Sequence, residues 1–240
     1  ALFGQYAPGL FQTRGYDLSQ VIEQMAFGTE GIYGIPIYVS SSYIFLFILF
    51  GAFLEKAGMI KLFTDVSLGL VGHLLGGPAK VAVFSSALMG TISGSGVANV
   101  VTTGQFTIPL MKRFGYRAAF AGGEESTASM GGQLMAPVMG AVAFLMIEYL
   151  GLPLTTILTA AIVPAFMHFF GVLVQVHLEA KRLGLRGLHP SELPNAWKVL
   201  RQGWLALMPL ILLVAVLMSG RTPFAAAFEC KAPRTRCDVW

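Results

Sequence analysis

Two short stretches that glycine interrupts hold most of the polar side chains that could do chemistry in this chain. The first is SGSGVAN at Ser93–Asn99, and the second is STASMGGQ at Ser126–Gln133. Their hydroxyl and amide oxygens suit a hard cation such as sodium, and a glycine-broken membrane helix frees main-chain carbonyls and amides for a ligand. The candidate substrate- and ion-binding residues are Ser93, Gly94, Ser95, Asn99, Thr103, Glu125, Ser129, Gly131, Gly132 and Gln133, of which Ser93, Ser95, Gly131 and Gly132 are the sodium candidates.

The composition indicates that these stretches lie among membrane segments. Of the 240 residues 55% are apolar and only 12% are charged, which is far from the balance of a soluble globular domain. The net charge of +4 comes from Lys and Arg between apolar runs, where they set topology, so we expect no nucleic-acid partner. Cys230 and Cys237 have no His close enough for a zinc pattern. We therefore expect no cofactor.

The uncharged run from Val81 to Met111 is too long for one straight helix across a bilayer. Its 31 residues would reach about 46 Å as a helix, against a hydrocarbon core of about 30 Å. Folding the run at SGSG gives two legs of about 13 to 15 residues, with both ends on the same face. The sequence therefore predicts a re-entrant helical hairpin whose tip, Ser93–Asn99, lies near the membrane midplane.

A broken helix is predicted directly after the hairpin. It begins at Arg117, carries Glu124 and Glu125, breaks at two glycines and resumes after Pro137. Carboxylates are costly against lipid, so both glutamates should face protein or a water-filled cavity. Whether they act on protons, on cations or only on local structure stays open.

The remaining apolar segments predict a polytopic, all-α membrane protein. Residues 31–54 and 154–178 are uncharged and long enough to span, and 56–77 has the pattern of an interfacial helix. Eleven of the sixteen Lys and Arg residues lie in segments 55–80, 112–117 and 181–201, which should be cytoplasmic.

The composition along the chain suggests three regions. We expect a surface or interfacial segment at 1–30, a transmembrane region at 31–220 and an aberrant or disordered tail at 221–240.

The same residues also fit other interpretations. Small residues four apart, such as Gly90 and Gly94, also let helices pack closely, so packing alone is the alternative to a binding site. TISGSG is similar to serine loops of intramembrane proteases, but no His is committed by spacing to Ser93 or Ser95, and GGPAK is too short for a P-loop. We predict no enzyme, and a channel is a weaker alternative.

Four motifs resemble the large membrane subunit of tripartite ATP-independent periplasmic (TRAP) transporters, in the fused-permease branch that works with TAXI-type binding proteins. They are FLFILFGAFLEKAG, GGPAKVAV, GTISGSGVANVVTTGQFTIPLMKRFGY and GGQLMAPVMGAVAFLM, and the resemblance runs from about Phe3 to about Leu188. It implies one half of an elevator-type transport domain, in a multi-pass permease of the bacterial inner membrane that takes up an organic anion, a carboxylate, with sodium. The implied partners are a TAXI-type periplasmic substrate-binding protein, the remaining half of the permease, small-subunit-like helices and the lipid bilayer.

The chain departs from that family pattern in two ways. Relatives usually have an apolar residue, Thr and Pro where this chain has Glu124, Met130 and Ala136. The second, inverted half of the family's transport domain is not in this sequence. The alternative function is therefore a non-transporting, truncated permease fragment that supplies only part of the site.

Overall fold

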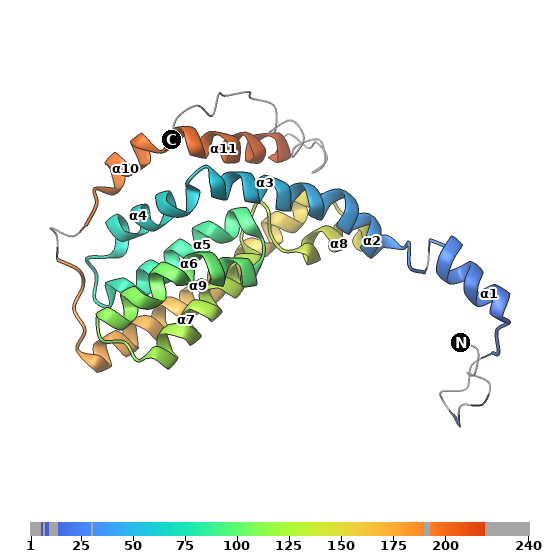
Figure 1. Ribbon diagram of the computed structural model, residues 1–240, viewed down its shortest axis with the longest axis horizontal. Coiled ribbons are helices and arrows are strands. Elements are labelled where there is room, and N and C mark those ends of the chain that lie inside the picture. The colour runs from blue at the N-terminus through green and yellow to red at the C-terminus, as the bar shows by residue number, and fades with distance from the viewer. Residues whose placement is uncertain (1–5, 7, 10–13, 30, 190–192, 219–240) are drawn as a thin grey trace. The chain divides into compact units, whose positions relative to one another are not determined.

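The computed structural model describes residues 6, 8–9, 14–29, 31–189 and 193–218, and every described element is helical (Figure 1). The all-α prediction is confirmed for these residues. The predicted tail at 221–240 and both cysteines lie outside them. The chain divides into two compact units, residues 1–45 and 46–240, which we describe separately.

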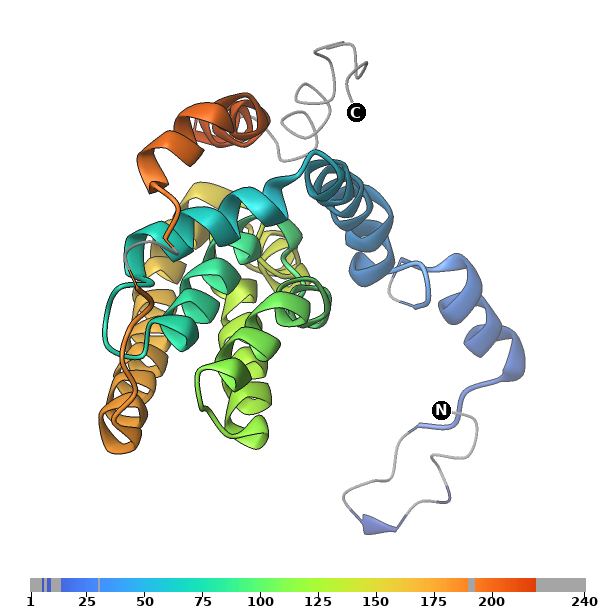
Figure 2. The ribbon, with the colours of Figure 1, turned by 60° about the vertical axis from the view of Figure 1, so that its left-hand side comes forward.

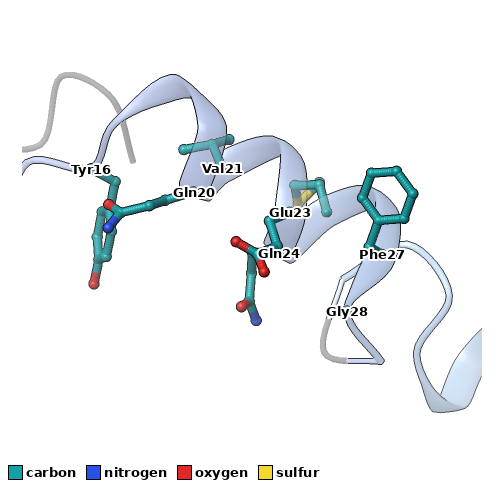
Figure 3. A pocket seen from close by; sticks show the side chains of 8 residues that line it. Tyr16, Gln20, Val21, Glu23, Gln24, Phe27 and Gly28 are labelled. Carbon is teal, nitrogen blue, oxygen red and sulfur yellow. The ribbon is translucent and has the colours of Figure 1, made fainter.

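The N-terminal unit is a series of short helical segments. They are α1 (Leu18–Ile22), a π-helical turn (Glu23–Phe27), α2 (Ile35–Val39) and a second π-helical turn (Ser40–Ile44). A shallow hollow beside α1 is lined by Tyr16, Gln20, Gln24 and Phe27, which all come from one continuous stretch of chain (Figure 3). Its lining comes from α1, the π-helical turn that continues it and the residues beside them, and we assign no site to it.

The first predicted span is confirmed as one long helix. It runs from Ile35 to Lys56 and is apolar enough to cross a membrane; its C-terminal part is α3 (Phe45–Lys56). Gly34 precedes the first turn and Pro36 lies within it, where a missing N–H is tolerated. The helix thus begins four residues later than the uncharged run.

The predicted hairpin is present in the second unit. α5 (Gly77–Ser93) and α6 (Gly96–Arg113) lie side by side in both views, joined by a turn at Gly94 and Ser95 (Figures 1 and 2). The legs have 17 and 18 residues, so each is longer than the predicted 13 to 15. The difference arises because Lys80, Lys112 and Arg113 continue the helices beyond the uncharged run.

α4 (Met59–Val71) precedes the hairpin and packs against α5. Met59, Leu62 and Phe63 of its predicted apolar face are buried, whereas Leu70 and Leu74 of the same face are exposed. The helix itself is confirmed, but its apolar face is covered by protein only over its first half.

The predicted broken helix follows the hairpin. α7 (Ala118–Gly131) starts after the N-cap Arg117, and a 3₁₀ turn (Gly132–Leu134) follows directly. α8 (Ala141–Leu150) begins after Gly140, so the break is longer than predicted and the helix does not resume directly after Pro137.

Three helices complete the unit. α9 (Leu154–Leu183) has 30 residues and keeps Pro164 inside it without a break, while α10 (Ala196–Gln202) and α11 (Trp204–Met218) follow. α10 forms at the end of the Lys- and Arg-rich segment 181–201, and it packs on α4. Among the described helices two can cross a membrane by length and composition, or three if the pair α10 and α11, bent by 76°, counts as one span.

The core of this unit lies between α5, α7 and α9. Its buried members are mostly small: Ala79, Ala82, Val83, Met111, Tyr116, Ala121, Ala128, Val172, Val176 and Ala180. Alanines at these positions let the three helices approach closely, as small residues do in membrane proteins.

Candidate functional site

The hairpin tip lies directly against the break after α7. A Cβ atom added to Gly94 would overlap the carbonyl oxygen of Met139, and one added to Gly132 would lie 2.9 Å from the Cα of Gly90. Gly94 has φ of 58°, and Met139 has φ of 53°, a left-handed conformation that is uncommon for a residue with a side chain. Main chain therefore meets main chain at this contact.

Four helix ends meet at this place. α5 ends at Ser93 and α7 at Gly131, whereas α6 begins at Gly96 and α8 at Ala141. The first turns of α6 and α8 carry partial positive charge and free N–H groups, and the last turns of α5 and α7 carry free carbonyls. Such an arrangement suits an anionic group and a cation in neighbouring positions.

Two of the candidate hydroxyls lie at the tip itself. The Ser95 side chain is exposed and its Oγ accepts a hydrogen bond from the Ala98 N–H at 3.3 Å, so Ser95 is the N-cap of α6. The half-buried Ser93 donates to the Ser95 carbonyl at 3.5 Å. Gln133 is also half-buried, and its Nε2 lies 3.2 Å from where a Cβ of Gly96 would be. Ser93, Ser95 and Gln133 thus lie at the tip together with the predicted glycines, of which Gly131 and Gly132 are buried.

Glu125 lies in a deeper layer that the tip does not reach. Its side chain is 0% exposed, and its carboxylate accepts hydrogen bonds from Ser86 and Ser129 at 3.1 Å, from Thr107 at 2.5 Å and from Thr103. These hydroxyls come from α5, α6 and α7. We call Glu125 and the four hydroxyl residues the hydroxyl cluster.

Asn99 links this cluster to the tip. It is fully buried, and its Nδ2 donates to the Ser86 carbonyl at 2.8 Å. The same amide nitrogen would lie 3.1 Å from a Cβ on Gly132. Asn99 therefore ties α6 to α5 immediately beneath the break.

The candidate residues thus separate into two layers. Ser93, Gly94, Ser95, Gly131, Gly132 and Gln133 form the tip layer, and Asn99, Thr103, Glu125 and Ser129 form the inner layer.

The two glutamates face protein, as predicted, but their surroundings differ. Glu125 has four hydroxyl donors, whereas Glu124 is 7% exposed and neither of its carboxylate oxygens has a hydrogen-bond partner among the described residues.

Sequence reasoning missed three residues that hold the site. Ser86 and Thr107 bind Glu125, and His168 of α9 hydrogen-bonds the Thr127 carbonyl through Nε2 at 3.0 Å. A Cβ on Gly131 would lie 2.6 Å from His168 Nε2, so the imidazole packs on the last turn of α7. The four-residue spacing of Asn99, Thr103 and Thr107 was the available signal, because it puts all three on one helix face. No comparable signal marked His168.

Within the described residues no three His, Cys, Asp or Glu side chains gather where they could hold a metal ion. The tip layer offers hydroxyl, amide and main-chain carbonyl oxygens.

Comparison with known proteins then decides the family. The family model of the tripartite ATP-independent periplasmic transporter, DctM component, matches residues 3–232. The chain belongs to this family. Members of the TRAP large permease group are transporter permeases and not enzymes, as the sequence reading held.

Several curated TRAP permeases are similar to the chain. The sialic acid TRAP transporter large permease protein SiaM of Vibrio cholerae is 25% identical over 182 residues, which are 75% of this chain and 42% of SiaM. The C4-dicarboxylate large permease protein DctM of Rhodobacter capsulatus is 29% identical over 75% of this chain and 44% of its own length. The 2,3-diketo-L-gulonate large permease protein YiaN of Escherichia coli is 25% identical over 70% of this chain and 39% of YiaN. The chain therefore spans less than half the length of each of these relatives.

Proposed function

We propose that this chain is the hairpin half of a TRAP permease that takes up an organic carboxylate with sodium across the bacterial inner membrane. The observation that carries the proposal is the main-chain contact of the hairpin tip at Gly94 with the broken helix at Met139. It brings four helix ends to one place, which simple close packing of helices does not require.

The carboxylate part rests on two supports. The N-terminal turns of α6 and α8 present N–H groups at the tip layer, where an anion is favoured. The named substrates of three relatives, sialic acid, C4-dicarboxylates and 2,3-diketo-L-gulonate, are all organic acids. We propose an acid of this general class and no particular one.

The sodium part rests on the oxygen atoms of the tip layer. Ser93 and Ser95 offer hydroxyls, and the last turns of α5 and α7 offer main-chain carbonyls, all of which are hard ligands. Glu125 supports this site from the inner layer, since its hydrogen bonds join α5, α6 and α7 beneath the tip.

We further propose that the chain needs partners to transport. It supplies one hairpin and one broken helix, and it spans 39% to 44% of the three relatives named above. The remaining half of the permease, small-subunit-like helices and a periplasmic binding protein of the TAXI type would complete the system. The hairpin and the helices packed against it would move together across the membrane, in an elevator-like shift.

The test is uptake into proteoliposomes by the longer permease that contains this chain, together with its binding protein. We expect accumulation of one acid from a screen of dicarboxylates, keto acids, amino acids and sugar acids, and we expect it only with an inward sodium gradient. Ser95→Ala should raise the sodium concentration needed for half-maximal uptake. Ser126→Ala should leave it unchanged, because among the described residues that exposed hydroxyl bonds only the Gly122 carbonyl of its own helix.

Uptake that continues unchanged when potassium replaces sodium would contradict sodium coupling. The chain alone, reconstituted in the same liposomes, should show no uptake, which is the truncated-fragment behaviour. Uptake by the chain alone would contradict the need for a second half, and single-channel currents would favour a channel.

A further inference from the structure

Glu124 is a buried acid for which the described residues provide no hydrogen bond. Its side chain is 7% exposed, and both carboxylate oxygens lack a partner there. The next residue, Glu125, receives four hydroxyl hydrogen bonds. Two identical side chains, adjacent in sequence, therefore lie in opposite environments.

The position of Glu124 on α7 explains its isolation. It comes three residues after Ala121 and four before Ala128, so it shares their helix face. Both alanines belong to the apolar core, together with Val172 and Val176 of α9. Glu125 is rotated by about 100° from Glu124 around the helix and meets the hydroxyls of α6. Glu124 thus lies on the face of α7 that packs into the small-residue core.

The charged and titratable groups near this core do not neutralise Glu124. Glu125 and Tyr116 are the groups that interact with it electrostatically, and neither is positive. Other charged or titratable side chains near the core already have partners. Lys80 of α5 donates a hydrogen bond to His177 of α9 at 3.2 Å, and His168 is bonded to the Thr127 carbonyl. Glu179 pairs with Arg182 at 3.7 Å. The other charged groups on the helices packed against α7 are exposed at helix ends: Lys112, Arg113, Arg117 and Lys181.

An ionised carboxylate without partners is strongly unfavourable in such surroundings, and binding a proton removes that penalty. The charge on Glu125 next to it makes a second negative charge still less favourable. Four hydroxyl donors replace the hydration of the Glu125 carboxylate, whereas the described residues offer none to Glu124. The arrangement of lowest free energy for the pair Glu124 and Glu125 therefore has one ionised and one neutral carboxyl group.

We infer that Glu124 is a proton-binding site, which holds one proton while α7 is packed against α5 and α9 and releases it to water when they separate. On release the O–H bond breaks, its electron pair stays on the carboxylate, and a water molecule takes the proton. The site is distinct from the tip layer, and the inference does not rest on the proposed transport function.

The direct test is infrared spectroscopy of the purified chain in detergent micelles near neutral pH. We expect a C=O stretching band of a protonated carboxyl group that shifts in D₂O, is absent from Glu124→Gln and persists in Glu125→Gln. A wild-type spectrum without that band, or a band that disappears with Glu125→Gln instead, would overturn the inference.

A second measurement is thermal unfolding from about pH 5 to about pH 9, on either side of neutrality. A proton held only in the folded state makes stability fall as pH rises, so the wild-type midpoint should fall over this range. In Glu124→Gln and Glu124→Val that fall should be largely lost, whereas the contributions of all other groups are shared by the three proteins. Equal slopes in all three would overturn the inference. So would a rise in the wild-type midpoint with NaCl at high pH that the variants lack, because sodium and not a proton would then occupy the site.

Discussion

The contact between α5 and the break after α7 can be tested by adding a single methyl group. Gly90 lies in α5, and a Cβ added there would overlap the Cα of Gly132. Both partners are main chain, so neither can move away by rotating a side chain. Overpacking of this kind costs about 1–3 kcal/mol. We therefore expect Gly90→Ala to destabilise the unit, although alanine is otherwise the better helix former.

Gly123→Ala is the matched control. Gly123 lies in α7, its position is exposed, and no atom lies within 4 Å of where its Cβ would be. Replacing an unhindered helical glycine by alanine stabilises by about 0.5–1 kcal/mol. The two variants should therefore differ by about 1.5–4 kcal/mol, with opposite signs relative to the wild type.

The assay is thermal unfolding of the purified chain in detergent micelles, where each kcal/mol corresponds to about 2–4 °C for a domain of this size. Gly90→Ala should melt below the wild type and Gly123→Ala at or above it. Gly132→Ala acts on the same contact, so its effect should not add to that of Gly90→Ala. If Gly90→Ala had the same unfolding midpoint as Gly123→Ala, α5 would not be in close contact with the break, and the geometry of the site would be refuted.

Three further outcomes follow from single side chains. Glu125→Ala removes the shared acceptor of four buried hydroxyls and should cost at least about 1–3 kcal/mol, whereas Ser126→Ala should change unfolding by no more than about 0.5 kcal/mol. His168→Leu removes the hydrogen bond to Thr127 and should cost about 0.5–1.5 kcal/mol, with faster proteolysis at the break as the readout. Burial raises the pKa of Tyr116 to about 12. The stability that the neutral phenol contributes is therefore present below about pH 10 and is lost as the pH rises towards 12. Ultraviolet titration should show a tyrosine that ionises at unusually high pH, and Tyr116→Phe should remove that step.

The hairpin was predictable because it follows from the length of the uncharged run. An uncharged run longer than the bilayer, with glycines in its middle, has few ways to fold, and the bend occurs at Gly94 as expected. The ends of the legs were predicted less well. Lys80, Lys112 and Arg113 have good helix propensity, so they extend the helices although they end the uncharged run.

The two layers of the site were not predictable from the residues alone. Spacing assigns Thr103 and Thr107 to one face of α6, and Glu125 and Ser129 to one face of α7. It does not say that these two faces meet, or that Ser86 of α5 closes the cluster. For the same reason both glutamates were expected to face protein, but their different surroundings appear only when the neighbouring helices are placed.

The hydroxyl cluster also limits how the tip can move. α6 carries the tip at its first residue and Thr103 two turns later, and Thr103 is bonded to Glu125 of α7. A tip that opened by swinging the whole of α6 would have to break these buried bonds, as well as the bond from Asn99 to α5, and would leave charged and polar groups unpaired in the core. Opening that is confined to the turn between Ser93 and Asn99 breaks none of the bonds to Glu125. The bonding pattern therefore favours α5, α6 and α7 moving together as one body, with local adjustment only at the tip.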